Sequence, residues 1–279
     1  MRASKLIPLL LLALLALGSL PATAAAKRKN PCLDPDRRQF LRCPDLRMKR
    51  PFDLSLDRSA KPGRVVLRAA SSIDNVGRGP AELFGIRTSS HGMRARQRIY
   101  RRRAGRRLGI FTGGTLFFTY IQGQTRYWKF RRGLYLQIWR INRRGQRTKL
   151  VRRSSKTDTC LRDLERTRPD VKRSPRRRVY PACSTNPRRR RETIGTSVGW
   201  SDVYPASYPG QWVDVTGLRG CFAYRHVGDP TNAVFESKER NNAATRVVRL
   251  PYRGGAPRCP KTGRLDAPRA PRADLPIEP

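Results

Sequence analysis

Histidine and acidic residues are scarce in this sequence. The 279 residues include two histidines, His91 and His226, and 20 acidic residues against 61 lysines and arginines. With so few imidazoles and no Cys-x-x-Cys pair, a structural zinc site is not expected. The scattered carboxylates give little support for a hydrolase with paired acids, and neither histidine lies beside a serine or cysteine signature of nucleophilic catalysis. No GxxxxGK[ST] phosphate loop occurs either.

Long apolar runs are missing after the N-terminus. The run Leu6–Leu20 has fifteen residues, which is too short to span a bilayer, and it follows a short basic segment. Small residues come next, with cleavage sites after Ala24 or Ala26, so residues 1–24 are predicted to be a secretory signal peptide. An uncleaved N-terminal anchor is the alternative. We therefore expect a secreted protein, extracellular or associated with the cell wall, with no membrane span after signal cleavage.

All six cysteines follow the predicted signal peptide. An even number of cysteines in an exported chain favours disulfide bonds. We expect a local Cys32–Cys43 bridge within an irregular lead-in rich in proline and charge, residues 25–63. A Cys221–Cys259 bridge is expected to hold part of a Pro-rich C-terminal tail, residues 253–279.

Between these ends the sequence has the pattern of short β-strands separated by turn signals. The strand-like segments are residues 64–75, 81–87, 135–142, 147–151, 211–218, 221–227 and 244–250. No amphipathic helix of ten or more residues is visible. An all-β, β-sandwich-like fold with long irregular, Arg-rich loops is therefore predicted. Residues 94–107 are expected to form a basic loop or edge hairpin, and residues 164–192 a polar insertion.

The formal net charge of the chain is +41, and charge of this size attracts polyanions. The candidate polyanion-binding residues are Arg101, Arg102, Arg103, Arg106, Arg107, Arg176, Arg177, Arg178, Arg188, Arg189, Arg190 and Arg191. In the expected compartment the partner is an anionic extracellular polymer or wall surface rather than nucleic acid. Solvated faces of a generally Arg-rich chain are the alternative, and the oligomeric state stays open.

Several segments, in order along the chain, resemble the bacterial lysyl oxidase family. They are residues 71–83 (SSIDNVGRGPAEL), 135–146 (YLQIWRINRRGQ), 154–163 (SSKTDTCLRD), 199–218 (GWSDVYPASYPGQWVDVTGL) and 233–250 (AVFESKERNNAATRVVRL). The resemblance implies a lysyl-oxidase-like β domain over residues 64–252. It also implies a secreted copper amine oxidase, which converts a primary amine such as a peptidyl lysine to an aldehyde and releases ammonia and hydrogen peroxide.

The same resemblance assigns the cofactor precursors. Lys156, four residues before Cys160, matches the family's cofactor lysine, and Tyr204 matches its precursor tyrosine. In the family these two side chains become lysine tyrosylquinone. Cys160 and Cys183 correspond to a family disulfide. Without the resemblance, Lys156 would be interpreted as a solvated lysine and Tyr204 as a packed loop aromatic.

In the family a His-x-His-x-His run holds the copper, since alternate side chains of a strand leave the same face. The corresponding positions here are Gln124, Arg126 and Trp128, or Thr125, Tyr127 and Lys129 if the register slips by one. Neither set contains a histidine. We therefore expect neither copper nor the quinone, with Arg126 supplying positive charge in place of the metal. An active enzyme of the protein-lysine 6-oxidase type, with copper and the quinone, is the alternative.

Two further expectations concern aromatic residues around this region. His226 shares a strand face with Phe222 and Tyr224, so it is interpreted as a half-buried structural histidine. The aromatic residues of Phe117–Phe130 are interpreted mainly as sheet core, with a stacking surface for nucleic acid as the disfavoured alternative. The predicted function is that of a non-catalytic binding or structural protein for anionic extracellular material.

Overall fold

The computed structural model of the protein describes residues 29–103, 107–121, 123–255 and 258–260. The predicted signal peptide and most of the predicted Pro-rich tail lie outside these residues. In the described part of the chain the only helix is α1 (Pro35–Arg38), and fifteen strands make up the rest of the regular structure. The all-β prediction is confirmed. Nowhere in these ranges is there a helix long and apolar enough to cross a membrane.

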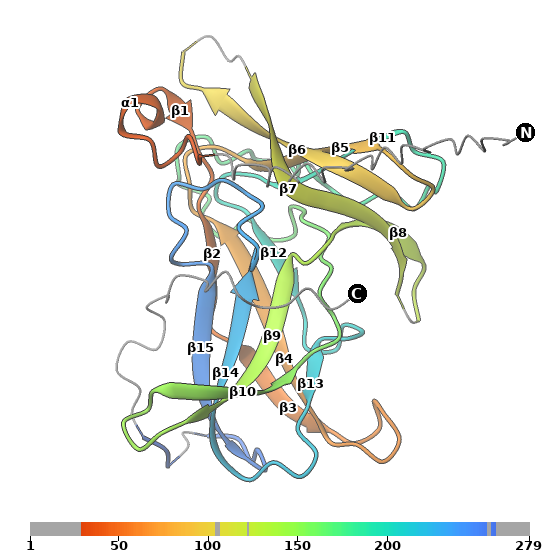
Figure 1. The fold of residues 1–279 in the computed structure, drawn as a ribbon, viewed down its shortest axis with the longest axis vertical. Coiled ribbons are helices and arrows are strands. Elements are labelled where there is room, and N and C mark those ends of the chain that lie inside the picture. The colour runs from red at the N-terminus through yellow and green to blue at the C-terminus, as the bar shows by residue number, and fades with distance from the viewer. Residues whose placement is uncertain (1–28, 104–106, 122, 256–257, 261–279) are drawn as a thin grey trace, which may run out of the picture.

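The strands form three sheets, and every pairing is antiparallel (Figure 1). The β6 sheet contains β1 (Leu41–Arg42), β5 (Ala81–Arg87), β6 (Gly92–Arg101), β7 (Arg107–Tyr120), β8 (Arg126–Phe130) and β11 (Arg191–Thr196). The β4 sheet contains β2 (Leu46–Met48), β3 (Phe52–Asp57), β4 (Val66–Asn75), β12 (Ser201–Tyr204) and β13 (Trp212–Asp214). The β14 sheet contains β9 (Leu134–Ile141), β10 (Arg147–Arg153), β14 (Gly220–Gly228) and β15 (Ala243–Leu250).

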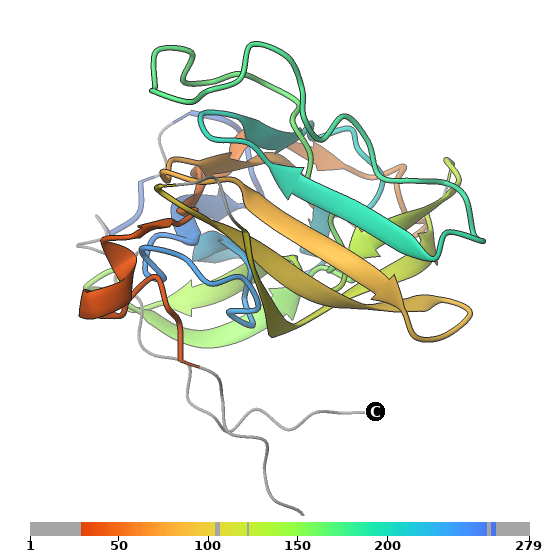
Figure 2. The ribbon, with the colours of Figure 1, turned by 90° about the horizontal axis from the view of Figure 1, so that it is seen from above.

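The β4 and β14 sheets pack against each other, because β2 contacts β14 and β15 while β13 contacts β9 and β10. The β6 sheet lies across one end of this pair (Figures 1 and 2). Strand β4 is buried along almost its whole length, as expected for a strand that is covered on both faces. The core continues from this strand through all three sheets.

The basic segment expected to form a loop or edge hairpin is instead strand β6, which lies between β5 and β7. Along it Met93, Ala95, Gln97 and Ile99 are buried, and arginines fill the alternate positions. This is the period of two that places one strand face in the core and the other toward solvent. The density of arginines hides that period in the sequence.

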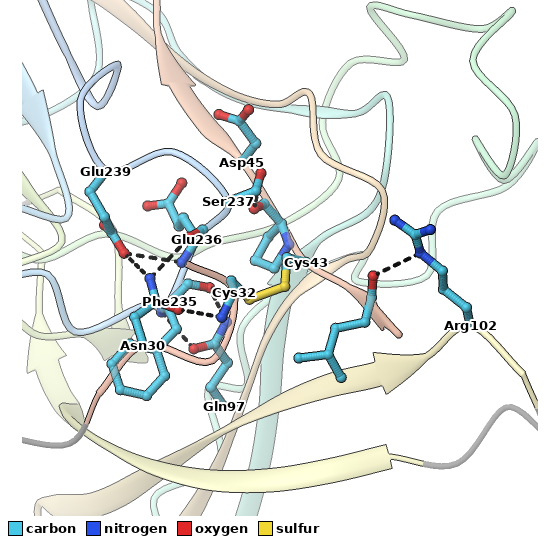
Figure 3. The surroundings of a disulfide bond; sticks show 12 residues. Asn30, Cys32, Cys43, Asp45, Gln97, Arg102, Phe235, Glu236, Ser237 and Glu239 are labelled. Atoms are coloured by element: carbon cyan, nitrogen blue, oxygen red, sulfur yellow. Dashed lines mark hydrogen bonds between the residues drawn. A yellow bond between two sulfur atoms is a disulfide. The ribbon is translucent and has the colours of Figure 1, made fainter. Parts of the chain in front are cut away.

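The lead-in also differs from its prediction, because residues 25–63 are not irregular over their described part. Strand β1 pairs with β6, and strands β2 and β3 pair with β4. Near the Cys32–Cys43 disulfide, the Gln97 side chain bonds both backbone groups of Phe235, at 2.7 and 2.8 Å (Figure 3). The disulfide packs in the same small cluster as Phe235. The N-terminal segment is therefore built into the fold.

All three predicted disulfides are present, namely Cys32–Cys43, Cys160–Cys183 and Cys221–Cys259.

The acidic residues are distributed less evenly than the charge of the chain suggests. Of the 20 acids in the chain, eight described ones have buried side chains: Asp45, Asp74, Glu82, Asp163, Glu192, Asp202, Asp229 and Glu236. Most of these carboxylates accept hydrogen bonds from nearby backbone or side-chain donors. Asp163, for example, accepts from the backbone N–H groups of Val179 and Tyr180 and from the backbone and hydroxyl of Ser197.

The segment Phe117–Phe130 forms the end of β7, a turn and β8. Phe118, Trp128 and Phe130 are buried in the core, and the rings of Phe118 and Trp128 lie 5.2 Å apart. Tyr120 is 59% exposed. The hairpin is therefore sheet core on one face, which disfavours an open stacking platform over its whole length.

Candidate functional site

Lys156 and Tyr204 lie in direct contact. Lys156 follows β10, and Tyr204 ends β12, where its backbone pairs with Ser71 of β4. The Lys156 Nζ atom lies 3.7 Å from the centroid of the Tyr204 ring and 4.5 Å from that of Tyr208. It donates a hydrogen bond of 2.7 Å to Gln211 Oε1. The two residues assigned as cofactor precursors are thus held together by two sheets and one amide side chain.

The Tyr204 hydroxyl is fixed by the segment that carries the Cys160–Cys183 disulfide. It accepts hydrogen bonds from the Cys160 backbone N–H at 2.8 Å and from Thr159 Oγ1 at 3.0 Å. Burial and then the charge of Asp202 raise the pKa of this phenol well above its usual value. The ring therefore stays a neutral phenol at physiological pH.

The charged groups around the pair perturb one another. Burial, followed by repulsion from Lys129, lowers the pKa of the Lys156 amine well below its usual value, against the attraction of Asp202. Burial also lowers the pKa of Lys129 to about 8, and it raises the pKa of Asp202 to about 7. One oxygen of Asp202 is buried without a hydrogen-bond partner among the described residues. The site is a compact cluster of two amines, one carboxyl group and two phenols.

Of the three positions that the resemblance assigns to the copper ligands in the first register, Gln124 reaches this cluster and the other two do not. Arg126 is exposed at the start of β8. Trp128 is fully buried, and its indole N–H donates to the backbone oxygen of Asn186 at 2.9 Å. Gln124 lies in the turn before β8 and accepts a hydrogen bond from the Tyr208 hydroxyl at 3.2 Å. The slipped register brings Tyr127 and Lys129 to the cluster instead.

These residues do not fit copper held as the family holds it. Gln124 and Arg126 supply an amide and a guanidinium, and neither guanidinium nor an indole N–H has a lone pair for a metal. The slipped register supplies a hydroxyl, a phenol and an ammonium. In the ranges that the structure describes, no three His, Cys, Asp or Glu side chains are grouped so as to hold a metal ion.

The two histidines lie apart from the β7–β8 turn. His91 is exposed between β5 and β6. His226 on β14 is fully buried, 4.7 Å from the ring of Tyr224, and neither of its ring nitrogens has a partner among the described residues. Burial and then the charge of Lys156 lower the pKa of His226 to about 3, so it is neutral at physiological pH. His226 lies beside Tyr224 as predicted, but it is fully rather than half buried, and its structural role stays a prediction.

Lys129, not Arg126, is the buried cation on strand β8. Its side chain is 1% exposed, whereas Arg126 faces solvent. The sequence predicts Lys129 only as a member of the slipped register, because the face of β8 that turns inward is decided by its pairing with β7. Asp202 and Gln211 lie in the Gly199–Leu218 segment that carried the resemblance, and Tyr208 lies between them.

The candidate polyanion-binding arginines lie on three segments. Arg101, Arg102 and Arg103 are exposed at the end of β6, Arg107 begins β7, and Arg106 lies outside the described residues. Residues 176–178 and 188–191 are all exposed, in the loop before β11 and at its first residue. Among the described members, only Arg189 lies within salt-bridge distance of a carboxylate, that of Glu192 at 2.9 Å.

Comparison with known proteins agrees with this geometry. A family model described as lysyl oxidase matches residues 145–256, a segment that contains Lys156, Tyr204 and Gln211. No curated protein matches the chain. Residues 145–256, less than half of the chain, are therefore similar to the lysyl oxidase family.

Proposed function

We propose that this chain is an exported member of the lysyl oxidase family that binds anionic extracellular polymer and does not carry out copper-dependent amine oxidation. The observation that carries the proposal is the position of Trp128. Its indole is buried in the core and bonded to Asn186, and the first of the two registers that the resemblance gives aligns this residue with the family's last histidine. With Arg126 exposed and two histidines in the chain, the family's three-imidazole set has no counterpart here.

Support for a polyanion partner comes from the exposed arginines. The three segments present ten exposed guanidinium groups, and only Arg189 has a carboxylate neighbour among the described residues. Arginine binds sulfate, phosphate and carboxylate groups with paired N–H donors, so exposed guanidinium groups without a carboxylate neighbour suit an anionic polymer. Export is supported by the N-terminal sequence and by the three disulfides.

Chromatography on a heparin column tests the binding. The wild-type protein is expected to elute above about 0.2 M salt, where most surface charges are already well screened. Replacing Arg176, Arg177 and Arg178 together with glutamine should move elution to lower salt. A matched control replaces three exposed cations of the β9–β10 hairpin, Arg143, Arg144 and Lys149, with glutamine. Equal shifts for the two triple variants, or wild-type elution below about 0.2 M, would contradict a localised polyanion site.

A second function, active amine oxidase, is favoured by one specific observation. The Lys156 amine and the Tyr204 ring are 3.7 Å apart, as a cross-link between them requires. We expect the protein purified from its secretion route to contain no stoichiometric copper and to give no quinone stain. One copper per chain together with quinone absorbance, lost in the Tyr204→Phe variant, would establish the oxidase instead.

A further inference from the structure

A small cavity opens beside the Lys156–Tyr204 pair. Its volume is about 130 Å³, and one wall is the Cys160–Cys183 disulfide. The side chains that line it and carry polar groups are Gln124, Tyr127, Lys129, Arg162, Tyr204 and Tyr208. Gln124 and Ala182 at its rim are exposed, so small solutes can enter from solvent.

The cavity has more hydrogen-bond donors than acceptors. The Lys129 ammonium carries three N–H groups, and its one hydrogen bond among the described residues goes to the Tyr208 oxygen at 3.3 Å. The Arg162 Nε atom is buried and has no partner in the same ranges. Buried N–H groups in proteins are nearly always paired with protein, ligand or ordered water, so these donors can bind the acceptor oxygens of a ligand.

The protein's own acceptors are not paired with these donors: Asp202 Oδ1 is buried without a partner among the described residues and accepts from neither Lys129 nor Arg162. In the described part of the chain, no carboxylate lies within salt-bridge distance of Lys129 or Arg162. The Tyr204 hydroxyl is engaged by Cys160 and Thr159, and Gln124 Oε1 already accepts from Tyr208. The charges of Asp158 and Asp202 act on Lys129, and that of Asp202 acts on Arg162, but neither carboxylate is within salt-bridge distance of these cations. The unused donors of Lys129 and Arg162 therefore favour a ligand with acceptor oxygens.

We propose that this cavity binds one small oxyanion, a phosphate or a short carboxylate, between Lys129 and Arg162. Its volume equals that of about four water molecules in the liquid, which admits such an ion and excludes a polymer chain. The site is thus separate from the surface arginines and binds a different class of ligand. The β8 residues that line this site, Tyr127 and Lys129, belong to the slipped register, and Lys129 donates to Tyr208.

Isothermal titration of the full mature chain with inorganic phosphate, and separately with acetate, tests the proposal in chloride buffer that screens the surface arginines. One saturable site per chain is expected for at least one of the two ions, and the better ion identifies the ligand type. Lys129→Met and Arg162→Gln should each weaken that binding at least tenfold. The surface triple variant of Arg176, Arg177 and Arg178 should bind as the wild type does.

Lys129→Met nearly conserves side-chain volume, and replacing a buried charge with a hydrophobic residue is often tolerated. If that variant does not fold, the half-exposed Arg162→Gln variant carries the test. Three results would overturn the proposal: heats that do not saturate for either ion, equal affinity in the wild type and both cavity variants, or loss of affinity in the surface triple variant. Elution of the cavity variants from heparin should match the wild type, which separates this test from that of polymer binding.

Discussion

Replacing Asp163 with alanine is expected to lower the free energy of unfolding by at least about 3 kcal/mol, because it leaves three buried donors and a partly buried one without an acceptor, and each buried donor costs about 1–3 kcal/mol. The Asp163 carboxylate is fully buried. It accepts from the backbone N–H groups of Val179, Tyr180 and Ser197 at 2.9, 3.2 and 2.7 Å, and from the Ser197 hydroxyl at 2.7 Å. One side chain thereby joins the polar insertion to the segment after β11.

Urea unfolding of the folded variants measures this loss. Asp163→Asn should lower the free energy of unfolding less than Asp163→Ala does. The amide oxygen can still accept the three hydrogen bonds that Oδ2 accepts. The amide N–H₂ group would face the Ser197 backbone N–H, so that one hydrogen bond is lost. Asp170→Ala, at an exposed aspartate of the same segment, is the control and should change stability by less than about 0.5 kcal/mol. An alanine variant at position 163 as stable as this control would show that water replaces the carboxylate at no cost.

The second large effect is expected at Trp128. Truncating a fully buried tryptophan to alanine removes its transfer energy and leaves a cavity, which typically costs about 3–5 kcal/mol. Here the ring also packs against Phe118 and bonds the backbone oxygen of Asn186. Trp128→Phe should recover most of the loss, since it keeps the apolar ring and removes only the indole N–H.

Tyr120→Ala is the matched control for Trp128, because it removes a ring from the same hairpin at a position that is 59% exposed. Thermal melts should place the Tyr120 variant close to the wild type and the Trp128→Ala variant far below it. If both aromatic residues cost the same, the hairpin would not be part of the core, and the structural reason for excluding a metal ligand at position 128 would fail.

The sequence predicted seven of the fifteen described strands, those whose flanking turn signals are strong: β4, β5, β9, β10, β13, β14 and β15. It missed β6 as a strand, where arginines occupy the outward positions and mask the alternation. It also missed β1 to β3, since short strands stabilised by distant partners leave little local pattern.

The candidate site was likewise predicted from the sequence only in part. The resemblance assigned Lys156 and Tyr204 as the two precursors of one cross-linked cofactor, and the structure places the two side chains together. The inward position of Lys129 depends on strand register, which a shift of one residue reverses. The cavity beside Arg162 depends on how the disulfide segment packs on β8, and neither composition nor spacing carries that information.

The burial of carboxylates has a consequence for how copies of this protein meet in solution. At least eight of the 20 acids lie inside, so the outer surface is more uniformly positive than the composition implies. Two copies therefore repel at all orientations in dilute salt, and the repulsion shortens to a range of about 10 Å at 0.1 M. Close packing of copies then requires counter-anions between them. An anionic polymer would therefore bridge neighbouring copies in any dense assembly, and its length would set how many copies bind to one polymer chain.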